Sequence, residues 1–471
     1  SQPAGTLTVR LALDGADGTI RFGQMPRKAP WSEAKQQAIA AAGDLITPGQ
    51  PFTLDWIRQD GHSIVRINSE EILRTQLDEF ILPTGDGGWP VHVGFIVPDD
   101  ATLLLHDFRA VGRIVREHQE HVAVWSHGDG GYRMFRGRGL CVTPKGTLIA
   151  ATGARGLRDK PGSKVRVWCT VRRSTDGGKT WSDQQVVRRP GANPSPSFVI
   201  DYETGDIFMI INGRESESTR RPDAGRRYAP VILKTEDDGL TWSEPRSMEV
   251  IRDDMRTLFA GPTPGLQLTQ GPHKGRLVVP GTYIEVGKGV REGSHGVVFY
   301  SDDHGRTWHL GGKVNEHTSE PTLAELNGGV LVSSSRSMDL SRDGTPMSVS
   351  YDGGETFTDY FEPVGAPDHG GSGNHVHCLT RYALPGESPA PDAPLLLSSG
   401  ARPRNTMTIY VSHDGGKMWP ISRVVYPGHC ADSYMIVLPD GRLALLYDKD
   451  GYRSVSLTTF PLEWLLKGQE N

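Results

Sequence analysis

One eight-residue pattern occurs five times in this 471-residue chain and limits the fold more than any other feature. The copies are STDGGKTW, TEDDGLTW, SDDHGRTW, SYDGGETF and SHDGGKMW, which begin at Ser174, Thr235, Ser301, Ser350 and Ser412. Each copy has an Asp that can accept hydrogen bonds from the backbone of its own turn and a Gly that tolerates positive φ. An aromatic residue then follows. The pattern predicts hairpin turns and no catalytic role for their Asp residues.

The spacing of the copies predicts the architecture around them. Consecutive copies begin about 49 to 66 residues apart, which leaves room for one four-stranded antiparallel sheet per repeat. Sheets of this kind, arranged radially, form a β-propeller. We therefore expect an all-β fold, with a propeller over residues 131–471.

The N-terminal region, residues 1–112, lacks the repeated pattern. It contains alternating stretches such as FTLDWIRQDGHSIVRINSEEI and VHVGFIVPDDATLLLHDFRAV, which predict strands joined by polar turns. We expect a β-sandwich that resembles a jelly-roll or laminin-G domain, with residues 113–130 as a linker. Carbohydrate binding and simple packing are both open for this domain, and no binding residue stands out.

Composition excludes several function classes. The net charge is −5 and the pI is about 6.4, so there is no electrostatic case for nucleic acid or for an anionic membrane. Mean hydropathy is −0.41 and no apolar run is long enough for a membrane span. The four cysteines lack zinc-site spacing, and we expect small buried side chains, with a Cys141–Cys169 bridge as the alternative.

Several segments between the turns extend the pattern into a family resemblance. Together with the turns, they resemble the sialidase (neuraminidase) family, in which the turn is known as the Asp-box or BNR repeat. The resemblance covers about residues 130–450 and implies a six-bladed propeller with the activity of a glycoside hydrolase like exo-α-sialidase. The segments are YRMFRGRGLCVTPKGTLIA, NPSPSFVIDYETGDIFMI, GPTPGLQL, GRLVVPGTY and SEPTLAELNGGVLVSSSR.

Members of this family hold the carboxylate of their substrate with three arginines. The planar guanidinium group suits this task because it pairs with a carboxylate through two parallel hydrogen bonds. The resemblance assigns these places to Arg136, to Arg336, which follows Glu320 by sixteen positions, and to Arg404. Arg155 resembles a further arginine that faces the substrate.

The same resemblance implies the catalytic groups. Asp159 is the one carboxylate of the segment ATGARGLRDKPGSK, where the family has its general acid and base, and Glu320 is the family's catalytic Glu. The family has Ile-Pro after its first arginine, whereas this chain has Gly137-Arg138, so Arg138 adds a cation to the predicted pocket.

The nucleophile motif departs from the family pattern. Sialidases use a Tyr about seven residues before the Pro of LPDG, and counting back from Pro439 without a gap gives Asp432. Tyr434 reaches this place only if two residues are missing, and the two side chains share one face of a strand. Both are candidates. Asp432 with Glu320 would be a carboxylate pair, suited to activating water for an inverting reaction or left as an inactive remnant.

Histidines lie close to this region in the sequence. His375 and His377, in GGSGNHVHC, share one strand face as a metal pair would, but no third ligand follows at a fixed spacing. We expect them to bind substrate or to act as a base, and we expect neither a metal nor a cofactor.

The leading hypothesis is an exo-glycosidase that removes a terminal acidic sugar, sialic or a related nonulosonic acid, from a glycoconjugate. The alternatives are a lyase acting on uronic acids, with His375, His377 or Tyr434 as base and acid, and a non-catalytic glycan-binding propeller. A carboxylate-bearing glycan is the expected partner. Such a substrate suits a secreted or periplasmic protein whose targeting segment has been removed.

Overall fold

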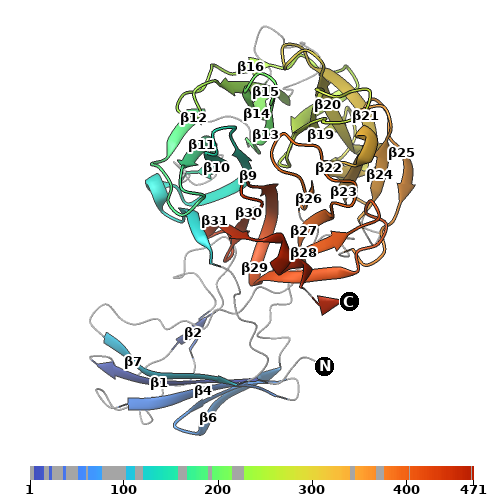
Figure 1. Cartoon of the computed structure of the whole chain (residues 1–471). Helices are drawn as coiled ribbons and strands as arrows, with labels where there is room; N and C mark the ends of the chain where they lie inside the picture. The colour runs from blue at the N-terminus through green and yellow to red at the C-terminus, as the bar shows by residue number, and fades with distance from the viewer. Residues whose placement is uncertain are drawn as a thin grey trace. The chain divides into compact units, whose positions relative to one another are not determined.

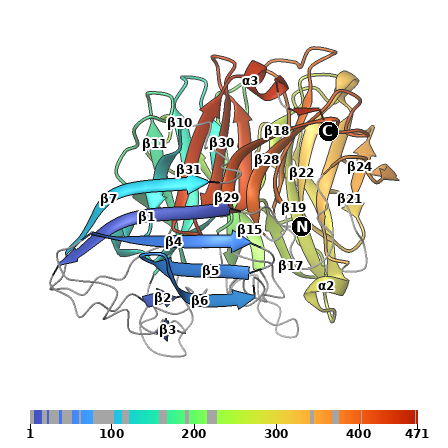
Figure 2. The ribbon, with the colours of Figure 1, turned by 90° about the horizontal axis from the view of Figure 1, so that it is seen from below.

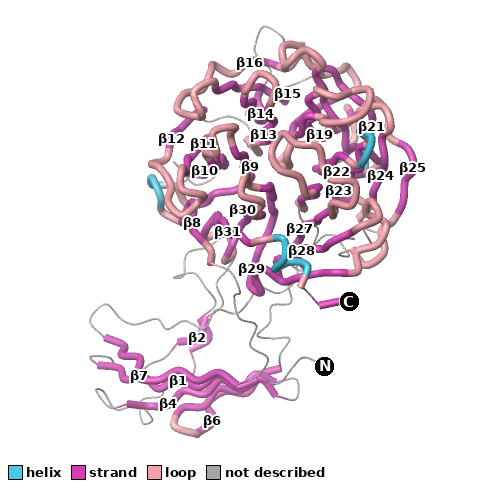
Figure 3. The backbone as a smooth tube through the Cα atoms, viewed as in Figure 1, coloured by secondary structure: helices cyan, strands magenta, loops and turns pink. Residues whose placement is uncertain are grey.

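In the computed structural model the chain forms two compact units, Ser1–Arg116 and Glu117–Asn471. The described residues are 5–14, 21–23, 36–38, 51–59, 62–76, 102–111, 120–156, 167–188, 194–214, 228–339, 345–366, 376–401, 404–467 and 469–470. The structure is all-β, as predicted, and Figure 3 shows strands and loops with few helices. None of the helices within these ranges is long and apolar enough to span a membrane.

The described residues of the N-terminal unit form one five-stranded antiparallel sheet and a two-stranded one. Phe52, Leu54, Ile64 and Ile67 are buried on the large sheet, consistent with the alternation read from the sequence. The second face of the predicted sandwich is not among the described residues. The large sheet has the order β6 (Glu70–Gln76), β5 (His62–Ile67), β4 (Pro51–Gln59), β1 (Gly5–Asp14), β7 (Thr102–Val111), and the small one pairs β2 (Arg21–Gly23) with β3 (Gln36–Ala38).

In the C-terminal unit the sheets stand around a common centre, each with one strand toward the middle (Figure 1). Turned by 90°, the strands are seen to run side by side along the axis of this ring (Figure 2). Two sheets have four strands each. Their orders are β9 (Met134–Val142), β10 (Leu148–Arg155), β11 (Val167–Ser174), β12 (Gln185–Arg188), and β22 (Thr318–Glu325), β23 (Leu331–Ser337), β24 (Met347–Ser350), β25 (Thr358–Phe361).

A nine-stranded sheet combines two sets of antiparallel strands through a single parallel pair, Tyr228 with Thr257. The first set is β13 (Ser197–Ile200), β14 (Ile207–Arg214), β15 (Tyr228–Thr235) and β16 (Arg246–Ser247). The second set is β17 (Met255–Ala260) and β18 (Leu266–Gln267), which both pair with β19 (Leu277–Glu285), followed by β20 (Ser294–Ser301) and β21 (His309–Asn315).

An eight-stranded sheet closes the ring, and one long strand belongs to both of its halves. This strand, β29 (Ile421–Val437), pairs with β28 (Asn405–Ser412) through its first part and with β30 (Leu443–Lys449) through its second part. The sheet begins with β26 (Cys378–Arg381) and β27 (Leu395–Ala401), and β32 (Gln469–Glu470) pairs with β29 at the side. The short helices are η2 (Asp129–Gly131), α2 (Val290–Gly293), η4 (Asn327–Gly329) and α3 (Leu462–Leu466).

The last strand of the ring is supplied from the opposite end of the unit. β8 (Val122–Ser126) pairs antiparallel with β31 (Ser454–Phe460), and its Trp125 is fully buried. The sequence predicts a linker over residues 113–130, and that prediction is wrong for this segment. The reason is that Val124 and Trp125 bury apolar surface that a linker would leave in water.

The five repeated turns share one hydrogen-bond pattern around their Asp. In the third copy, Ser301 Oγ donates to Asp303 Oδ1 at 2.9 Å, and the same oxygen accepts the Thr307 N–H at 2.8 Å. Trp308 Nε1 donates to the Gly305 carbonyl at 3.1 Å. Gly305 has φ +74, and a Cβ there would lie 2.6 Å from the Phe208 ring, so this position needs glycine. The Asp of each other copy likewise accepts from its own turn.

Candidate active site

Polar residues from distant parts of the chain meet where the inner strands of the ring converge. Arg136 lies on β9, Glu320 on β22, Arg336 on β23 and Asp432 on β29, while Arg404 directly precedes β28. In Figure 1, β9 and β22 lie next to the middle of the ring. The structure therefore brings together residues that are up to about 300 positions apart in the sequence.

Irregular strand pairing turns three of these segments toward the centre. The register shifts where β9 pairs with β10 around Gly137, where β22 pairs with β23 around Glu320, and where β29 pairs with β30 around Asp432. Gly137 and Glu320 have φ of +71 and +51. Bulges of this kind redirect side chains and are common beside functional sites.

Asp432 is held by two arginines of β9 and by the main chain. Its Oδ2 lies 3.4 Å from Arg138 Nη2 and 3.9 Å from Arg136 Nη2, and its Oδ1 accepts the Val376 N–H at 3.2 Å. The carboxylate is 11% exposed. These contacts place an anion at the position where the ungapped alignment predicts one.

Arg138 serves a buried ion pair. Its side chain is 1% exposed, and its Nη2 lies 2.6 Å from Asp448 Oδ2. The sequence predicts that Arg138 faces the substrate, and this prediction is wrong because a buried cation must be paired and its partners are protein carboxylates. Burial raises the pKa of Asp448 to about 6, against the lowering effect of Arg138, and the charge of Asp432 raises it further.

Glu320 and Arg336 form a second ion pair, with Arg336 Nη1 2.8 Å from Glu320 Oε2. The Glu320 N–H donates to Thr282 Oγ1 at 2.7 Å, which fixes the backbone at its unusual φ. Burial alone would lower the pKa of Arg336, but the charge of Glu320 raises it overall, with a smaller contribution from Asp432. The Arg336–Glu320 pair and Asp432 therefore lie within electrostatic reach of each other.

Tyr452 is a member of the cluster that sequence reasoning missed. The Arg136 guanidinium lies over its ring, 4.4 Å from the centroid, and Arg404 Nη1 donates a short hydrogen bond to its hydroxyl. The residue has φ +66 in the turn between β30 and β31 and is 5% exposed. The sequence DKDGY indicates only a hairpin turn there, so no motif pointed to it.

Arg136 and Arg155 complete the cationic side of the cluster. Burial lowers the pKa of Arg136, but the charges of Tyr452, Asp432, Asp448 and Glu320 raise it overall. For Arg155, at the end of β10, burial and the nearby positive charge of Arg136 lower the pKa. The positive charge of Arg136 therefore disfavours the charged form of Arg155, and a bound anion would offset this repulsion.

Tyr434 lies in the hydrophobic core and not beside Glu320. It is fully buried, packs among residues that include Trp125 and Phe135, and its hydroxyl accepts the Phe198 N–H at 3.2 Å. Burial raises its pKa well above the ordinary value of 10. The alternative alignment, in which Tyr434 is the nucleophile, is therefore wrong. Tyr434 follows Asp432 by two residues on β29, which moves its side chain roughly 7 Å along the strand and into the core.

The remaining predicted residues divide into buried and undescribed ones. His377 is fully buried and its Nε2 lies 2.7 Å from Ser334 Oγ, so it supports the inner strands and does not line the cluster. Asp159 and His375 lie outside the described residues. All four cysteines are buried and free, so the Cys141–Cys169 bridge is not formed. No group of three metal-ligating side chains occurs within the described ranges.

Comparisons with known proteins agree with the ring-shaped fold. The profile of the BNR repeat-like domain matches residues 146–445. A sialidase of Micromonospora viridifaciens is 35% identical over 367 residues, which is 72% of this chain and 53% of that protein. A sialidase of Bacteroides fragilis is 27% identical over 69% of this chain and 62% of that protein. The chain thus spans a little over half the length of these curated relatives.

Solved structures show the same fold. The intramolecular trans-sialidase of Ruminococcus gnavus has a TM-score of 0.59 and 18% identity, covering 73% of this chain and 97% of that one. The leech intramolecular trans-sialidase has a TM-score of 0.60 and 15% identity, covering 99% of this chain and 95% of that one. At these identities the likeness concerns the fold.

Proposed function

This chain belongs to the sialidase superfamily of BNR-repeat proteins, and from that premise we propose that it is an exo-glycosidase that hydrolyses a terminal acidic sugar. We interpret its ring as a six-bladed propeller of four-stranded sheets. The two sets of the nine-stranded sheet and the two halves that share β29 support this interpretation. A carboxylate-bearing glycan outside the cytoplasm, met by a secreted or periplasmic enzyme, is the proposed substrate.

The observation that carries the proposal is the cluster of arginines at the centre. Arg136, Arg155, Arg336 and Arg404 face two carboxylates, Glu320 and Asp432, which leaves four positive against two negative charges. Arg138 and Asp448 neutralise each other below them. The excess of two positive charges favours an anionic sugar, and the guanidinium groups of Arg136, Arg336 and Arg404 would bind its carboxylate through paired hydrogen bonds.

Asp432 determines the proposed chemistry. In the ungapped alignment it corresponds to the nucleophilic tyrosine of sialidases. Its side chain is shorter by the length of the ring, and this difference would leave room for a water molecule next to the anomeric carbon. We propose that Asp432 and Glu320 activate that water and that Asp159 protonates the leaving oxygen. Attack by water in one step inverts the anomeric configuration, whereas a covalent intermediate would retain it.

The test is hydrolysis of 4-methylumbelliferyl α-sialoside, followed by fluorescence and by proton NMR of the first anomer released. Release of the β-anomer first supports the single displacement, and release of the α-anomer first would show a covalent intermediate. Glu320→Gln should abolish turnover, and Glu236→Gln, an exposed carboxylate of a repeated turn, should not. Binding without turnover by the wild type would instead identify a glycan-binding protein, a reading that the ion pairing of Asp432 favours.

A further inference from the structure

Tyr452 contacts two of the arginines that the proposed function assigns to the substrate carboxylate. The guanidinium of Arg136 lies 4.4 Å from the centroid of its ring, and its hydroxyl accepts a short hydrogen bond from Arg404 Nη1. Arg136 lies on β9 and Arg404 directly precedes β28, and these strands belong to different sheets of the ring. One buried side chain, 5% exposed, therefore connects two sheets at the centre.

The backbone at both ends of the contact between Arg404 and Tyr452 has an unfavourable conformation. Arg404 has φ +78 and Tyr452 has φ +66, in the left-handed region that bulky side chains rarely adopt. Glycine would adopt either value with less strain. Strain of this kind persists only where the surrounding structure holds it, and it is common at functional sites. Here the two strained residues are the two whose side chains meet.

The strand β29 holds the main chain on both sides of this contact. The carbonyl and the Nδ1 atom of His429 accept the N–H groups of the two residues before Tyr452, each at 2.9 Å. The ring of His429 packs edge-on to that of Tyr452, with the centroids 5.5 Å apart. The next residue, Cys430, donates its N–H to the Arg404 carbonyl at 3.0 Å. Two consecutive residues of β29 thus fix the positions from which Tyr452 and Arg404 reach each other.

An arginine that is fixed before its ligand arrives binds an anion more tightly than a mobile one. Long side chains of this type lose rotamer freedom when they are ordered, and this loss opposes binding. The Arg136 guanidinium lies over the ring of Tyr452, and its Nη2 is 3.9 Å from Asp432 Oδ2. The hydroxyl of Tyr452 orders Arg404 in the same way. Tyr452 therefore lowers the entropic cost of holding a carboxylate between two guanidinium groups.

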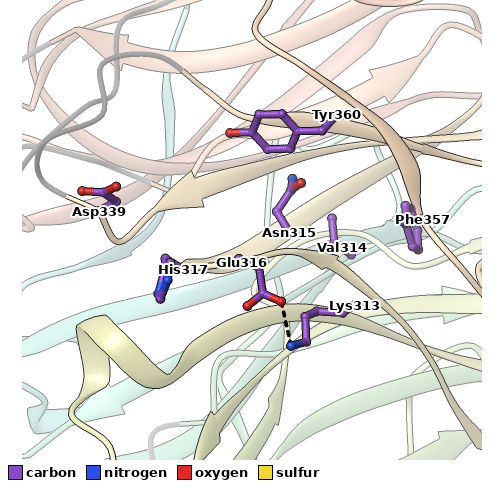
Figure 4. Close-up of a pocket in the computed structure, with 8 residues that line it drawn as sticks. All are labelled: Lys313, Val314, Asn315, Glu316, His317, Asp339, Phe357 and Tyr360. Atoms are coloured by element: carbon purple, nitrogen blue, oxygen red, sulfur yellow. Dashed lines mark hydrogen bonds and ion pairs between the residues drawn. The ribbon is translucent and has the colours of Figure 1, made fainter.

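A cavity of about 450 Å³, lined by residues of β21 and β25, is a poorer place for a carboxylate. Its Lys313 is already paired with Glu316 at 2.9 Å, and Asp339 adds a second negative charge (Figure 4). Two carboxylates with one ammonium group repel an anion. A ligand that carries a carboxylate is thus expected at the central arginines, and a preference for the charged ligand reports on them.

We propose that Tyr452 is a positioning residue, which holds Arg136 and Arg404 in the orientation in which they bind the carboxylate of the acidic sugar. The inference rests on the proposed function for the identity of the ligand, and it adds a residue that acts on that ligand through the arginines. His429 supports Tyr452 in this role. The effect of Tyr452 is confined to the charged group of the ligand, because Tyr452 acts through guanidinium groups.

The test compares the 2,3-didehydro-2-deoxy analogue of N-acetylneuraminic acid with its methyl ester, in which the negative charge is removed and the rest is unchanged. Calorimetric titration of the wild type should show tighter binding of the acid. Tyr452→Phe should lower the ratio of acid to ester affinity about fivefold, because Arg404 loses its acceptor. Tyr452→Leu also removes the ring beneath Arg136 and should lower the ratio about tenfold or more. The affinity for the ester should stay within about twofold.

Tyr382→Phe is the matched control. The Tyr382 hydroxyl donates to the Gly441 carbonyl at 2.9 Å, in the turn at the opposite end of β30 from Tyr452. This variant loses a comparable hydrogen bond and should keep the ratio of the wild type. An unchanged ratio in Tyr452→Phe, an equal loss for acid and ester, or the same fall in Tyr382→Phe would overturn the proposal.

A double-variant cycle shows whether Tyr452 acts through Arg404. Arg404→Met should lower the ratio by itself, and adding Tyr452→Phe to it should lower the ratio less than about twofold further, because the two changes disrupt the same contact. Independent, multiplicative losses would mean that the hydroxyl does not act through Arg404, contrary to the proposal. Melting curves of all variants show that the folded protein is compared.

These titrations do not depend on turnover, so they separate this proposal from the proposed function. If the wild type prefers the acid through Tyr452 but does not cleave the aryl sialoside, the hydrolase is refuted and the positioning role stands. If the wild type cleaves the sialoside but Tyr452→Phe keeps the full preference, the hydrolase stands and the positioning role is refuted. Equal affinity of the wild type for acid and ester would also refute the positioning role.

Discussion

Asp303, in a repeated turn, and Asp432, in the central cluster, are both held by several hydrogen-bonding groups, but these groups come from different distances along the chain. The partners of Asp303 lie within four residues. The partners of Asp432 lie 56 and 294 residues away. An aspartate with local uncharged donors fixes a turn, whereas one with distant arginines creates an electrostatic site that exists only in the folded ring.

The largest expected difference between the two regions is in turnover. Asp432→Asn should lower kcat for the aryl sialoside about a thousandfold, because it removes the base that activates water. Asp303→Asn should leave kcat within about threefold, since the change is confined to its own turn. Initial rates of both variants, with melting curves to show that they are folded, make the measurement. Similar rates for the two variants would contradict a catalytic role for Asp432.

The second difference concerns pH. Because the pKa of Asp448 is about 6 in the folded state and 3.8 ordinarily, the folded state binds this proton more tightly. Its stabilising contribution is complete below pH of about 3.8 and is lost as the pH rises to about 6, a change of roughly 3 kcal/mol. Urea unfolding of the wild type and of Asp448→Asn between pH 4 and 7 should show the two free energies diverging by this amount. Parallel curves would contradict the raised pKa.

A third change tests whether the centre needs guanidinium geometry or only charge. Arg136→Lys should lower kcat/KM about thirtyfold, because an ammonium group cannot form two parallel hydrogen bonds with a carboxylate. Arg442→Lys is the control, since Arg442 pairs locally with Asp440 at 2.8 Å and is expected to have no effect on rate. A normal rate for Arg136→Lys would mean that the substrate carboxylate binds elsewhere.

A change at Asp303 in the third repeated turn should alter the stability of the protein. Burial would raise the pKa of Asp303, but hydrogen bonds from Thr307 and Ser301 lower it to about 2. Its stabilising contribution is therefore present above pH of about 3.8 and lost as the pH falls toward 2. At neutral pH, Asp303→Ala should cost about 1 to 2 kcal/mol of unfolding free energy, measured in urea. Asp183 is exposed and lies outside the turn hydrogen bonds, so it serves as the control. Asp183→Ala should leave the free energy of unfolding almost unchanged.

The smallest expected effect on rate is that of a change at Tyr434, which follows Asp432 by two residues on β29. Tyr434→Phe leaves the Phe198 N–H without its acceptor and should cost about 1 kcal/mol of stability while kcat stays within about twofold. Chemical denaturation and initial rates measure the two quantities. A collapse of kcat in this variant would return Tyr434 to the list of catalytic candidates.

The same contrast explains what the sequence could predict. The turns were readable because every donor to Asp303 lies in one eight-residue pattern. Arg136, Arg336 and Glu320 were found through family resemblance, and the structure brings them together. Tyr452 could not be found, because it follows an ordinary hairpin turn and its contacts with Arg136 and Arg404 form only in the folded ring. The burial of Arg138 and Tyr434 depends on how far along β9 and β29 each residue lies. Strand periodicity predicts the face that a side chain occupies, but not its position along the strand relative to the core.

The pairing of β8 with β31 determines when the protein can finish folding during its synthesis. β8 leaves the ribosome more than 300 residues before its partner. At 5 to 20 residues per second, the interval is roughly 20 to 60 s. Throughout that time the edge of β8 that pairs with β31 has no partner strand. The nascent chain therefore exposes an unpaired strand edge that can aggregate with other chains and that a holdase chaperone can bind. A chain that is released before β31 is made cannot close the ring.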